Sequence, residues 1–172
     1  IWTTSLNDSI YQPRQLFKIR GSQSDINWSP NDNYLAFTSS RSDNSYIGIY
    51  SFKDKKVVFM DPSVDRDFSP EWSPNNKKVA FIRRPYAKDV PPFSPQKIAR
   101  PWSIRVLDLK SGHSTSLWEA DPGMGSAFFN QFPRATLKWT NDNQLIFPWE
   151  KNGWMHLYSL DVQSGNTSQL TY

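Results

Sequence analysis

Cysteine is absent from the 172 residues, and histidine occurs only twice. Without cysteine the chain has no disulfide and no thiolate zinc site. The two histidines, His113 and His156, lie too far apart in the sequence to give a zinc-ligand spacing. No apolar run is long enough to span a membrane, and no signal-peptide pattern is visible. We therefore expect no metal, no cofactor and no membrane partner.

Charge of one sign is not concentrated anywhere in the chain. The net charge is +4, with 20 basic and 16 acidic residues scattered along the sequence. No basic run is longer than a pair such as Arg83-Arg84, which gives no support for nucleic-acid binding. Asp61, Asp65 and Asp67 lie close together but lack the central glycine and terminal glutamate of a helix-loop-helix calcium loop. We interpret these aspartates as turn residues.

Aromatic residues and turn formers are abundant instead. Aromatics make up 15% of the chain and include 8 Trp, and there are 13 Pro. Aromatic side chains suit half-buried sheet surfaces, whereas Pro, Asn and Asp favour turns. This combination predicts an all-β chain.

A repeat organises the sequence. Residues 28–37 read Trp-Ser-Pro-Asn-Asp-Asn-Tyr-Leu-Ala-Phe, and residues 72–81 read Trp-Ser-Pro-Asn-Asn-Lys-Lys-Val-Ala-Phe. A looser and shorter copy covers residues 139–147. In each copy a strand ends at the Trp, the Pro/Asn/Asp segment turns, and a second strand alternates apolar residues. Two further strands complete each unit, for example Trp154 to Leu160 followed by Thr167 to Thr171.

Four antiparallel strands recurring about every 40 residues are typical of a β-propeller blade. Residues 1–20 are expected to supply the last two strands of one blade, Ile1 to Leu6 and Arg14 to Ile19. Residues 21–60, 61–120 and 121–172 each form a further blade, with a Pro-rich insertion at 84–101. A half blade leaves the ring open. We therefore expect one partial propeller domain, a fragment of a ring of about six to eight blades.

A β-sandwich with evenly spaced strands is the alternative fold, although it gives no reason for Trp-Ser-Pro-Asn to recur. The propeller predicts that Trp72 is a buried blade residue. It also predicts structural roles for the aromatic residues of all three copies: Trp28, Trp72, Trp139, Phe37, Phe81 and Phe147.

The copies resemble the TolB-like propeller repeat, in which Trp-Ser-Pro-Asp-Gly precedes a Lys-rich strand ending in Ala-Phe. Here Asn31-Asp32 and Asn75-Asn76 stand at the Asp-Gly positions, and Asn tolerates the left-handed backbone that Gly adopts there. Residues 147–159 read Phe-Pro-Trp-Glu-Lys-Asn-Gly-Trp-Met-His-Leu-Tyr-Ser. With Pro-Trp-Ser-Ile-Arg-Val at 101–106, this segment looks like the propeller of bacterial prolyl oligopeptidase-family serine peptidases, in the dipeptidyl and acylaminoacyl peptidase branch.

This resemblance implies a parent protein with a C-terminal α/β-hydrolase domain, whose Ser-Asp-His triad acts through an acyl-enzyme. No Gly-x-Ser-x-Gly elbow occurs in these residues, so the catalytic domain is not present and no catalytic residue is predicted here. We interpret His156 as a packed strand residue that shares one face with Trp154 and Tyr158.

Substrate contacts are the remaining chemical question. The dipeptidyl branch holds a free amino terminus with two adjacent glutamates, but Glu71, Glu119 and Glu150 are all isolated, so that anchor is missing here. Glu150, beside Trp149, and Arg134 are the candidate substrate-binding residues because both stand where a central cavity is expected. The alternative for each is a surface or inter-strand ion pair.

Two functions stay open on the sequence. The first is a propeller that restricts access and orients short peptides for the hydrolase domain of a serine peptidase. The second is a non-enzymatic TolB-like scaffold that binds a protein. The resemblance favours the first, in a bacterial periplasmic or secreted setting. An open ring exposes blade faces and sheet edges, so we also expect self-association.

Overall fold

The computed structural model describes residues 1–5, 12–86, 101–123, 125 and 137–172. These residues contain fourteen strands, which confirms the predicted all-β, partial-propeller fold class. Within the same residues, no helix has the length and apolarity needed to cross a membrane.

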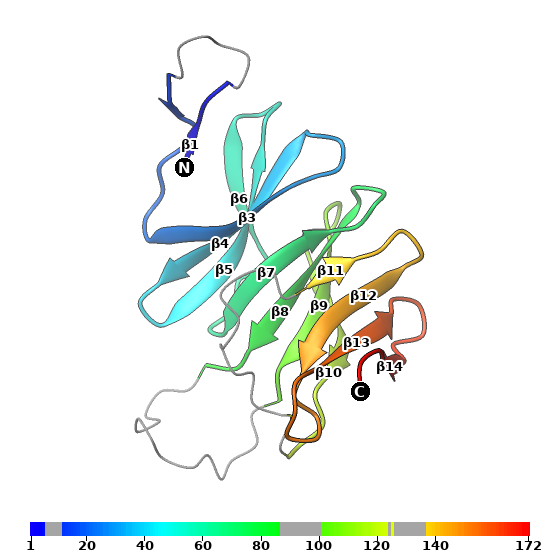
Figure 1. Cartoon of the computed structure of the whole chain (residues 1–172). Coiled ribbons are helices and arrows are strands. Elements are labelled where there is room, and N and C mark those ends of the chain that lie inside the picture. The colour runs from blue at the N-terminus through cyan, green and yellow to red at the C-terminus, as the bar shows by residue number, and fades with distance from the viewer. Residues whose placement is uncertain (6–11, 87–100, 124, 126–136) are drawn as a thin grey trace.

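The strands form antiparallel sets of four, which we call blades (Figure 1). Blade 1 contains β3 (Ser22–Trp28), β4 (Tyr34–Arg41), β5 (Asn44–Ser51) and β6 (Lys56–Met60). Blade 2 contains β7 (Arg66–Trp72), β8 (Lys78–Arg84), β9 (Ser103–Asp108) and β10 (Ser114–Glu119). Blade 3 contains β11 (Lys138–Trp139), β12 (Gln144–Trp149), β13 (His156–Asp161) and β14 (Thr167–Gln169).

The amino-terminal strands are shorter than predicted. β1 (Trp2–Thr3) pairs only with β2 (Arg14–Gln15), in a small sheet of its own. The predicted strand from Arg14 to Ile19 is therefore wrong beyond Gln15. Beyond Gln15 no strand is formed, although Leu16 and Phe17 still make backbone hydrogen bonds with Ile1. Instead, Leu16, Phe17 and Ile19 pack against the outer face of blade 1.

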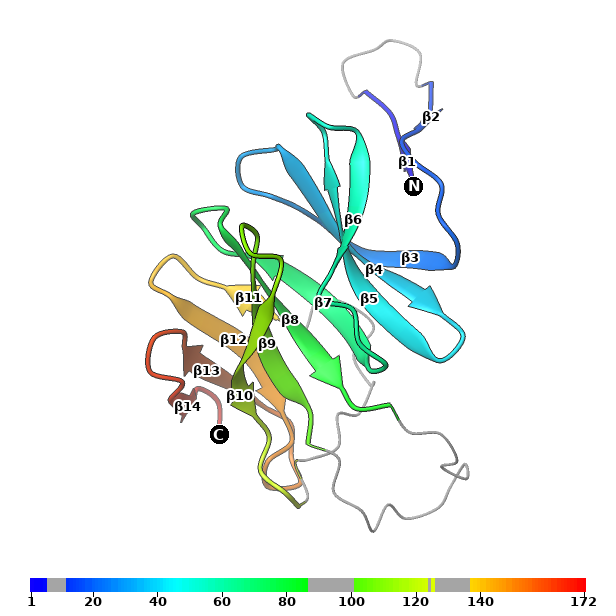
Figure 2. The ribbon, with the colours of Figure 1, turned by 180° about the vertical axis from the view of Figure 1, so that it is seen from behind.

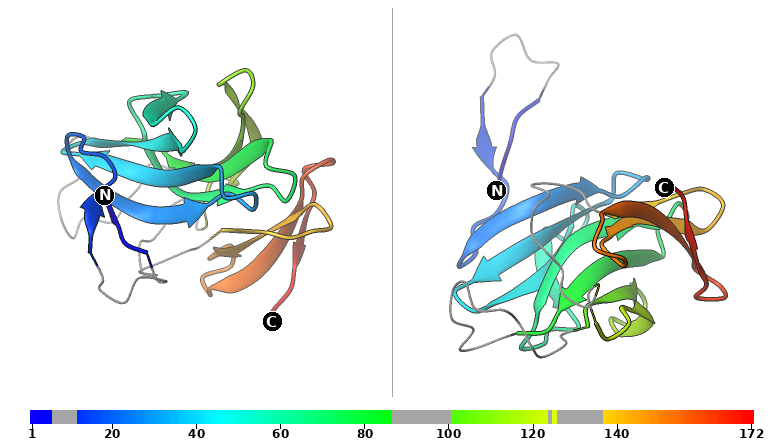
Figure 3. Two further views of the ribbon diagram at one scale, coloured as in Figure 1. Left: turned by 90° about the horizontal axis from the view of Figure 1, so that it is seen from above. Right: turned by 60° about the horizontal axis from the view of Figure 1, so that its bottom comes forward.

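A single backbone bridge joins the strands of blades 1 and 2. The only bridge between them among the described residues is the parallel pair Ser45 and Arg66, on β5 and β7. The Ser45 hydroxyl also donates a 2.7 Å hydrogen bond to the Asp67 carbonyl. Figure 3 shows that the sheets turn relative to one another instead of continuing as one flat layer. Contact between blades is therefore mainly contact between their faces.

The strands of every blade end on two opposite sides of the molecule. Antiparallel order places the first and third hairpin turns of every blade, such as residues 29–33 and 52–55, on one side, which we call the turn face. The connections between blades, such as residues 61–65, and the central hairpin loops, such as residues 150–155, lie on the opposite side, the linker face (Figures 1 and 2).

Hydrogen bonds from a hydroxyl explain the Ser in the repeat. The Ser29 hydroxyl donates to the Asn31 side-chain oxygen at 2.8 Å and accepts from the Tyr34 backbone N–H at 2.9 Å. Ser73 and Thr140 make the same bonds in the other two blades. Each bond satisfies a turn group that the ladder leaves unpaired, so the motif closes the hairpin between the first two strands.

Left-handed residues complete these turns. The φ angles of Asp32, Asn76 and Asn143 are 58°, 61° and 62°. Asn and Asp adopt this region more readily than other non-glycine residues. The turns therefore keep the geometry that Gly supplies in the usual repeat.

Four of the six repeat aromatics are buried, Trp139 is half-buried against the core between blades 2 and 3, and Trp28 is the exposed exception. Trp72 is 4% exposed, which confirms the predicted burial, and Phe37, Phe81 and Phe147 are also buried. Trp28 is 49% exposed and stacks on Phe52, with ring centroids 4.8 Å apart. The same motif position is thus buried only where a complete neighbouring blade covers it.

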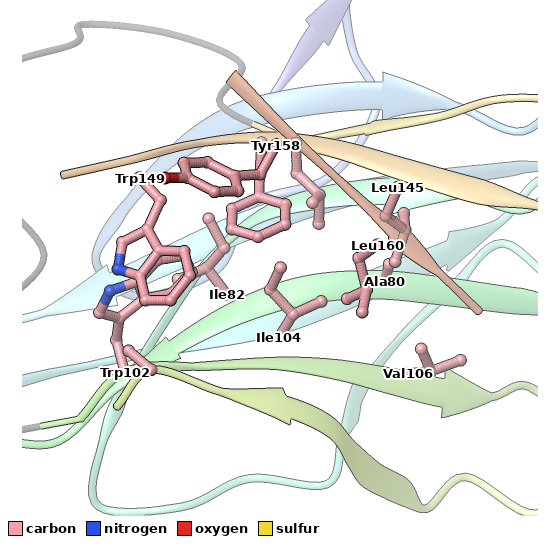
Figure 4. Packing of buried hydrophobic residues seen from close by; sticks show 12 residues of the cluster. Ala80, Ile82, Trp102, Ile104, Val106, Leu145, Trp149, Tyr158 and Leu160 are labelled. Carbon is pink, nitrogen blue, oxygen red and sulfur yellow. The ribbon is translucent and has the colours of Figure 1, made fainter. Parts of the chain in front are cut away.

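Aromatic residues fill the interface between blades 2 and 3. Trp102, Phe147, Trp149 and Tyr158 belong to one buried cluster, and the half-buried Trp118 packs between them. Figure 4 shows the indole nitrogens of Trp102 and Trp149 turned to the same place. Both donate to the carbonyl of Gly125, at 3.3 and 2.9 Å. A buried indole N–H needs such a partner, so Gly125 completes this core.

Candidate functional site

The first strands of the three blades surround a hollow of about 610 Å³. This is the position of the central channel in a propeller. Most of its lining residues have polar side chains, and they come from β3, β7 and the start of β11: Gln23, Ser24, Asp25, Ile26, Asn27, Ser69, Pro70, Glu71, Leu137 and Lys138.

A β-bulge shapes the channel wall in both complete inner strands. The pairing of β3 shifts between Ser24 and Asn27, and that of β7 shifts between Phe68 and Glu71. Within the bulges, Asp25 and Ser69 have φ angles of 49° and 53°. These residues precede the repeat Trp by the same three positions in each blade. A bulge re-aims the side chains that follow it, and here it directs them along the channel.

A row of polar side chains crosses all three blades. The Asn27 amide donates to the Glu71 carboxylate at 2.5 Å, and the Lys138 ammonium lies 3.2 Å from both Glu71 oxygens. The Asn27 amide also donates to the Pro70 carbonyl at 3.1 Å. The side chain of Glu71 is 13% exposed and that of Lys138 is 60% exposed. The row therefore presents one carboxylate between an amide and a mobile cation.

The sequence did not predict these three residues as a site, although all three share one position relative to the repeat. Asn27, Glu71 and Lys138 each stand directly before the repeat Trp of their blade. The repeat aligns this position, but the three residue types differ, so the motif itself gives no reason to connect them. Only the placement of β3, β7 and β11 around one hollow brings them together.

Aspartates at the connection between blades 1 and 2 bind an arginine, Arg83, from β8. Arg83 binds the Asp67 carboxylate with two hydrogen bonds, of 2.7 and 2.9 Å, and donates to the Asp61 carbonyl at 2.9 Å. Burial raises the pKa of Asp67, while the bonds and charge of Arg83 oppose that rise. Asp61 also accepts from the Ser114 hydroxyl. Among the described residues no group of acidic or histidine side chains is arranged to hold a metal.

The proposed substrate residues are only partly described. Glu150 follows the end of β12, directly after the buried Trp149, and is half-buried on the linker face. It lies apart from the Asn27–Glu71–Lys138 row, which lines the channel wall. Arg134 lies outside the described residues.

His156 lies in a strand, as predicted, but Trp154 does not. His156 begins β13 and pairs with Trp149 across the strands. Trp154 lies before β13 and is 77% exposed, so the predicted shared face of Trp154, His156 and Tyr158 is wrong at Trp154. The Gly153 turn, with a φ angle of 84°, delays the start of the strand. His113 is exposed in the turn between β9 and β10.

Repeated four-stranded blades with their first strands around a common hollow define a β-propeller. Known structures contain the same arrangement. The chain is similar to TolB from Acinetobacter baumannii, with a TM-score of 0.62 and 17% identity over 94% of this chain and 35% of that one. It is also similar to Porphyromonas gingivalis dipeptidyl peptidase 4, with a TM-score of 0.60 and 14% identity over 91% of this chain and 26% of that one.

A third match is the β-propeller domain of the Trilobed protease from Pyrococcus furiosus. Its TM-score is 0.58, with 22% identity over 87% of this chain and 42% of that one. The chain thus spans well under half the length of each of these proteins. No family model and no curated protein matches the sequence. The fold is therefore shared with the propellers of TolB and of peptidases.

Proposed function

We propose that this chain is a non-catalytic propeller segment of a serine peptidase that cleaves short peptides. The propeller restricts access to a C-terminal α/β-hydrolase domain and orients the substrate for it. The polar row of Asn27, Glu71 and Lys138 carries this proposal, because it lines the channel with groups that bind peptide backbone and termini. Likeness to peptidase propellers agrees with it.

Blade topology favours the linker face for the hydrolase domain. The first strand of an antiparallel four-stranded blade starts, and the last strand ends, at the same edge. A domain joined to such a blade by a short connection therefore lies on that side. Glu150 is on the linker face, so in this arrangement it faces the hydrolase domain rather than solvent.

The first experiment identifies the parent protein and its chemistry. An antibody against the chain captures the natural protein, which is then treated with a fluorophosphonate probe. A band much larger than 20.0 kDa that labels covalently is the expected result, because only an activated serine reacts. A captured band that never labels would instead favour a TolB-like protein-binding scaffold, the alternative that the TolB match supports.

A second experiment tests the channel in the labelled parent. Glu71→Ser combined with Lys138→Ser removes the charged part of the row. We expect longer peptides to be cleaved faster relative to dipeptide and tripeptide substrates, with unchanged probe labelling. Glu119→Ser combined with Lys18→Ser, which removes one exposed charge of each sign outside the channel, is the matched control. Identical length dependence in the variant and the parent would remove the row from substrate selection.

Glu150→Gln tests the linker-face carboxylate separately. We expect a higher KM for peptides with a free amino terminus and unchanged kinetics for amino-blocked peptides, because a carboxylate pairs with the terminal ammonium. Equal kinetics of variant and parent on both substrates would exclude Glu150. Arg134 is proposed as the second substrate contact, and Arg134→Gln in the same assay checks it.

A further inference from the structure

A second hollow lies on the turn face, where blades 1 and 2 meet. Its volume is about 680 Å³. Val58, Met60 and Leu109 contribute an apolar floor, and Lys56, Lys77 and Lys110 stand around it. None of these six residues lines the central channel. The hollow is therefore a separate groove, which we call the lysine groove.

The carboxylates of this groove are already engaged in turns. Asp54 accepts from the Ser51 hydroxyl at 2.7 Å. Asp108 accepts from the Ser111 backbone N–H at 2.8 Å, and these turn hydrogen bonds lower the pKa of Asp108. Both carboxylates stabilise hairpins, and the three lysines of the rim outnumber them in the lining of the groove.

The rim lysines, in contrast, form no ion pair with any carboxylate of the described residues. Lys56, Lys77 and Lys110 are all exposed. Lys53, Lys55 and Lys78 extend the same basic surface, since they lie in or beside the turns of blades 1 and 2. Both blades thus present unpaired positive charge toward one groove.

The floor adds an apolar contact to this charge. Val58 lies on the outer strand β6 and is 51% exposed, although it is surrounded by a basic rim. Its neighbour across the groove is the half-buried Leu109, whose backbone N–H donates to the Lys77 carbonyl at 3.0 Å. That hydrogen bond joins two turns of blade 2 and holds Leu109 beside Lys77 in that wall of the groove.

We propose that the lysine groove binds an acidic peptide segment that places one large apolar side chain on Val58, Met60 and Leu109. Carboxylates on both sides of that side chain then pair with Lys56, Lys77 and Lys110. Charge complementarity selects the acidic flanks, and the floor selects the apolar residue between them. This proposal does not depend on the proposed peptidase function, because the groove opens on the turn face, away from the linker face.

A peptide fits the groove better than a nucleic acid does. No Arg lines the groove, whereas phosphate and base recognition favours the arginine fork. The aromatic ring at the site, Tyr34, is stacked on Trp72, with ring centroids 5.9 Å apart, and is not presented for base stacking. The floor is recessed between two blades, which a flat anionic membrane surface does not reach.

The test measures binding of a fluorescein-labelled peptide, Gly-Glu-Glu-Leu-Glu-Glu-Gly, to the chain by fluorescence anisotropy. We expect Lys77→Gln with Lys110→Gln to weaken binding at least about tenfold, and Val58→Asp to do the same. The control pair Arg14→Gln with Lys18→Gln removes equal charge from exposed residues of the amino-terminal segment, outside the groove, and should change binding less than about twofold. Replacing the peptide leucine by serine should weaken binding about fivefold or more.

Three outcomes would overturn the proposal. The first is no binding at about 1 mM peptide. The second is equal weakening by the groove pair and the control pair, which indicates a diffuse charge effect. The third is that oligothymidylate or phosphatidylserine vesicles compete more tightly than the acidic peptide, which assigns the surface to a nucleic acid or a membrane. Val58→Asp and the lysine pair change exposed residues, and circular dichroism of each variant verifies the fold.

Discussion

The two interfaces between blades differ in their side chains and in their polar contacts. Between blades 1 and 2 the core is mainly aliphatic, and atoms of the repeat link the blades. The Trp72 indole donates to the Asn27 carbonyl at 3.1 Å, and the Asn31 backbone N–H donates to the Asn76 side chain at 2.9 Å. Between blades 2 and 3 a cluster of large aromatic side chains adjoins the aliphatic core, and the exposed Lys138 pairs with the largely buried Glu71.

This difference shows what a repeat can specify. The contacts between blades 1 and 2 are made on both sides by residues in the motif or directly before it, so one sequence pattern supplies both partners. The aromatic cluster between blades 2 and 3 uses Trp102, Trp118 and Trp149, which have no counterpart in blade 1. Where two neighbouring blades both carry the full motif, motif residues make the contacts between them. Where the motif is looser, in blade 3, large side chains that do not recur in the repeat fill the interface.

The largest expected effect is the loss of either core tryptophan. Trp72→Ala and Trp149→Ala should each lower the free energy of unfolding by about 3–5 kcal/mol, because each creates a large cavity in a closed core. Denaturant unfolding of the chain measures both. Since the two residues belong to separate clusters, the double variant should show nearly additive losses. An unchanged midpoint for Trp72→Ala would contradict its structural role.

The sequence predicted the blades well and the channel poorly, for one physical reason. Strand alternation, the Ser-mediated turn and left-handed residues such as Asn76 act within about ten residues, so a local pattern reveals them. The strand from Lys56 to Met60 in particular has the bounds that its apolar run indicates. The contact of Asn27 with Glu71 joins two blades, and no local pattern encodes it. The exposure of Trp28 likewise depends on a neighbouring sheet, which no local pattern encodes.

The next prediction concerns Arg83 of blade 2, which stabilises the connection between blades 1 and 2. Arg83→Met leaves the Asp67 carboxylate buried without its two strongest hydrogen bonds. We expect a loss of about 3 kcal/mol or more at pH 7, measured by denaturant unfolding. Arg83→Met combined with Asp67→Leu should recover most of it, because an apolar pair removes the buried charge. A double variant as unstable as the single one would mean that packing, and not charge, sets the cost.

The stability of the same variant should depend more steeply on pH than that of the parent chain. Burial raises the pKa of Asp67 above its ordinary value of 3.8, and without Arg83 only the smaller charge effect of Arg105 opposes that rise. The folded variant then binds a proton more readily than the unfolded chain. Its stability should therefore increase as the pH falls from the raised pKa toward 3.8, relative to the parent chain. Parallel pH profiles of variant and parent would indicate that Asp67 stays ionised through another partner.

Trp28 sharpens the comparison between equivalent positions. Its ring stacks on Phe52 but is half-exposed, so Trp28→Ala should cost about 1–2 kcal/mol, clearly less than Trp72→Ala. Chemical denaturation of the two single variants under one condition makes the comparison. Equal losses would show that Trp28 is covered in solution, for example by self-association of the open blade face. Repeating the measurement at several protein concentrations distinguishes that case, because association makes stability concentration-dependent.

The smallest effect concerns the polar row itself. Lys138→Ala should change stability by less than about 1 kcal/mol, because this exposed cation is well solvated without its partner. Glu71→Ala should cost more, since it also leaves the Asn27 amide without its carboxylate acceptor. A double-mutant cycle between the two residues isolates their coupling. A coupling near zero, with Glu71→Ala still the costlier change, would show that Asn27 rather than Lys138 positions the carboxylate. Glu71 would then be held by blade 1 and left available to a ligand from the side of blade 3.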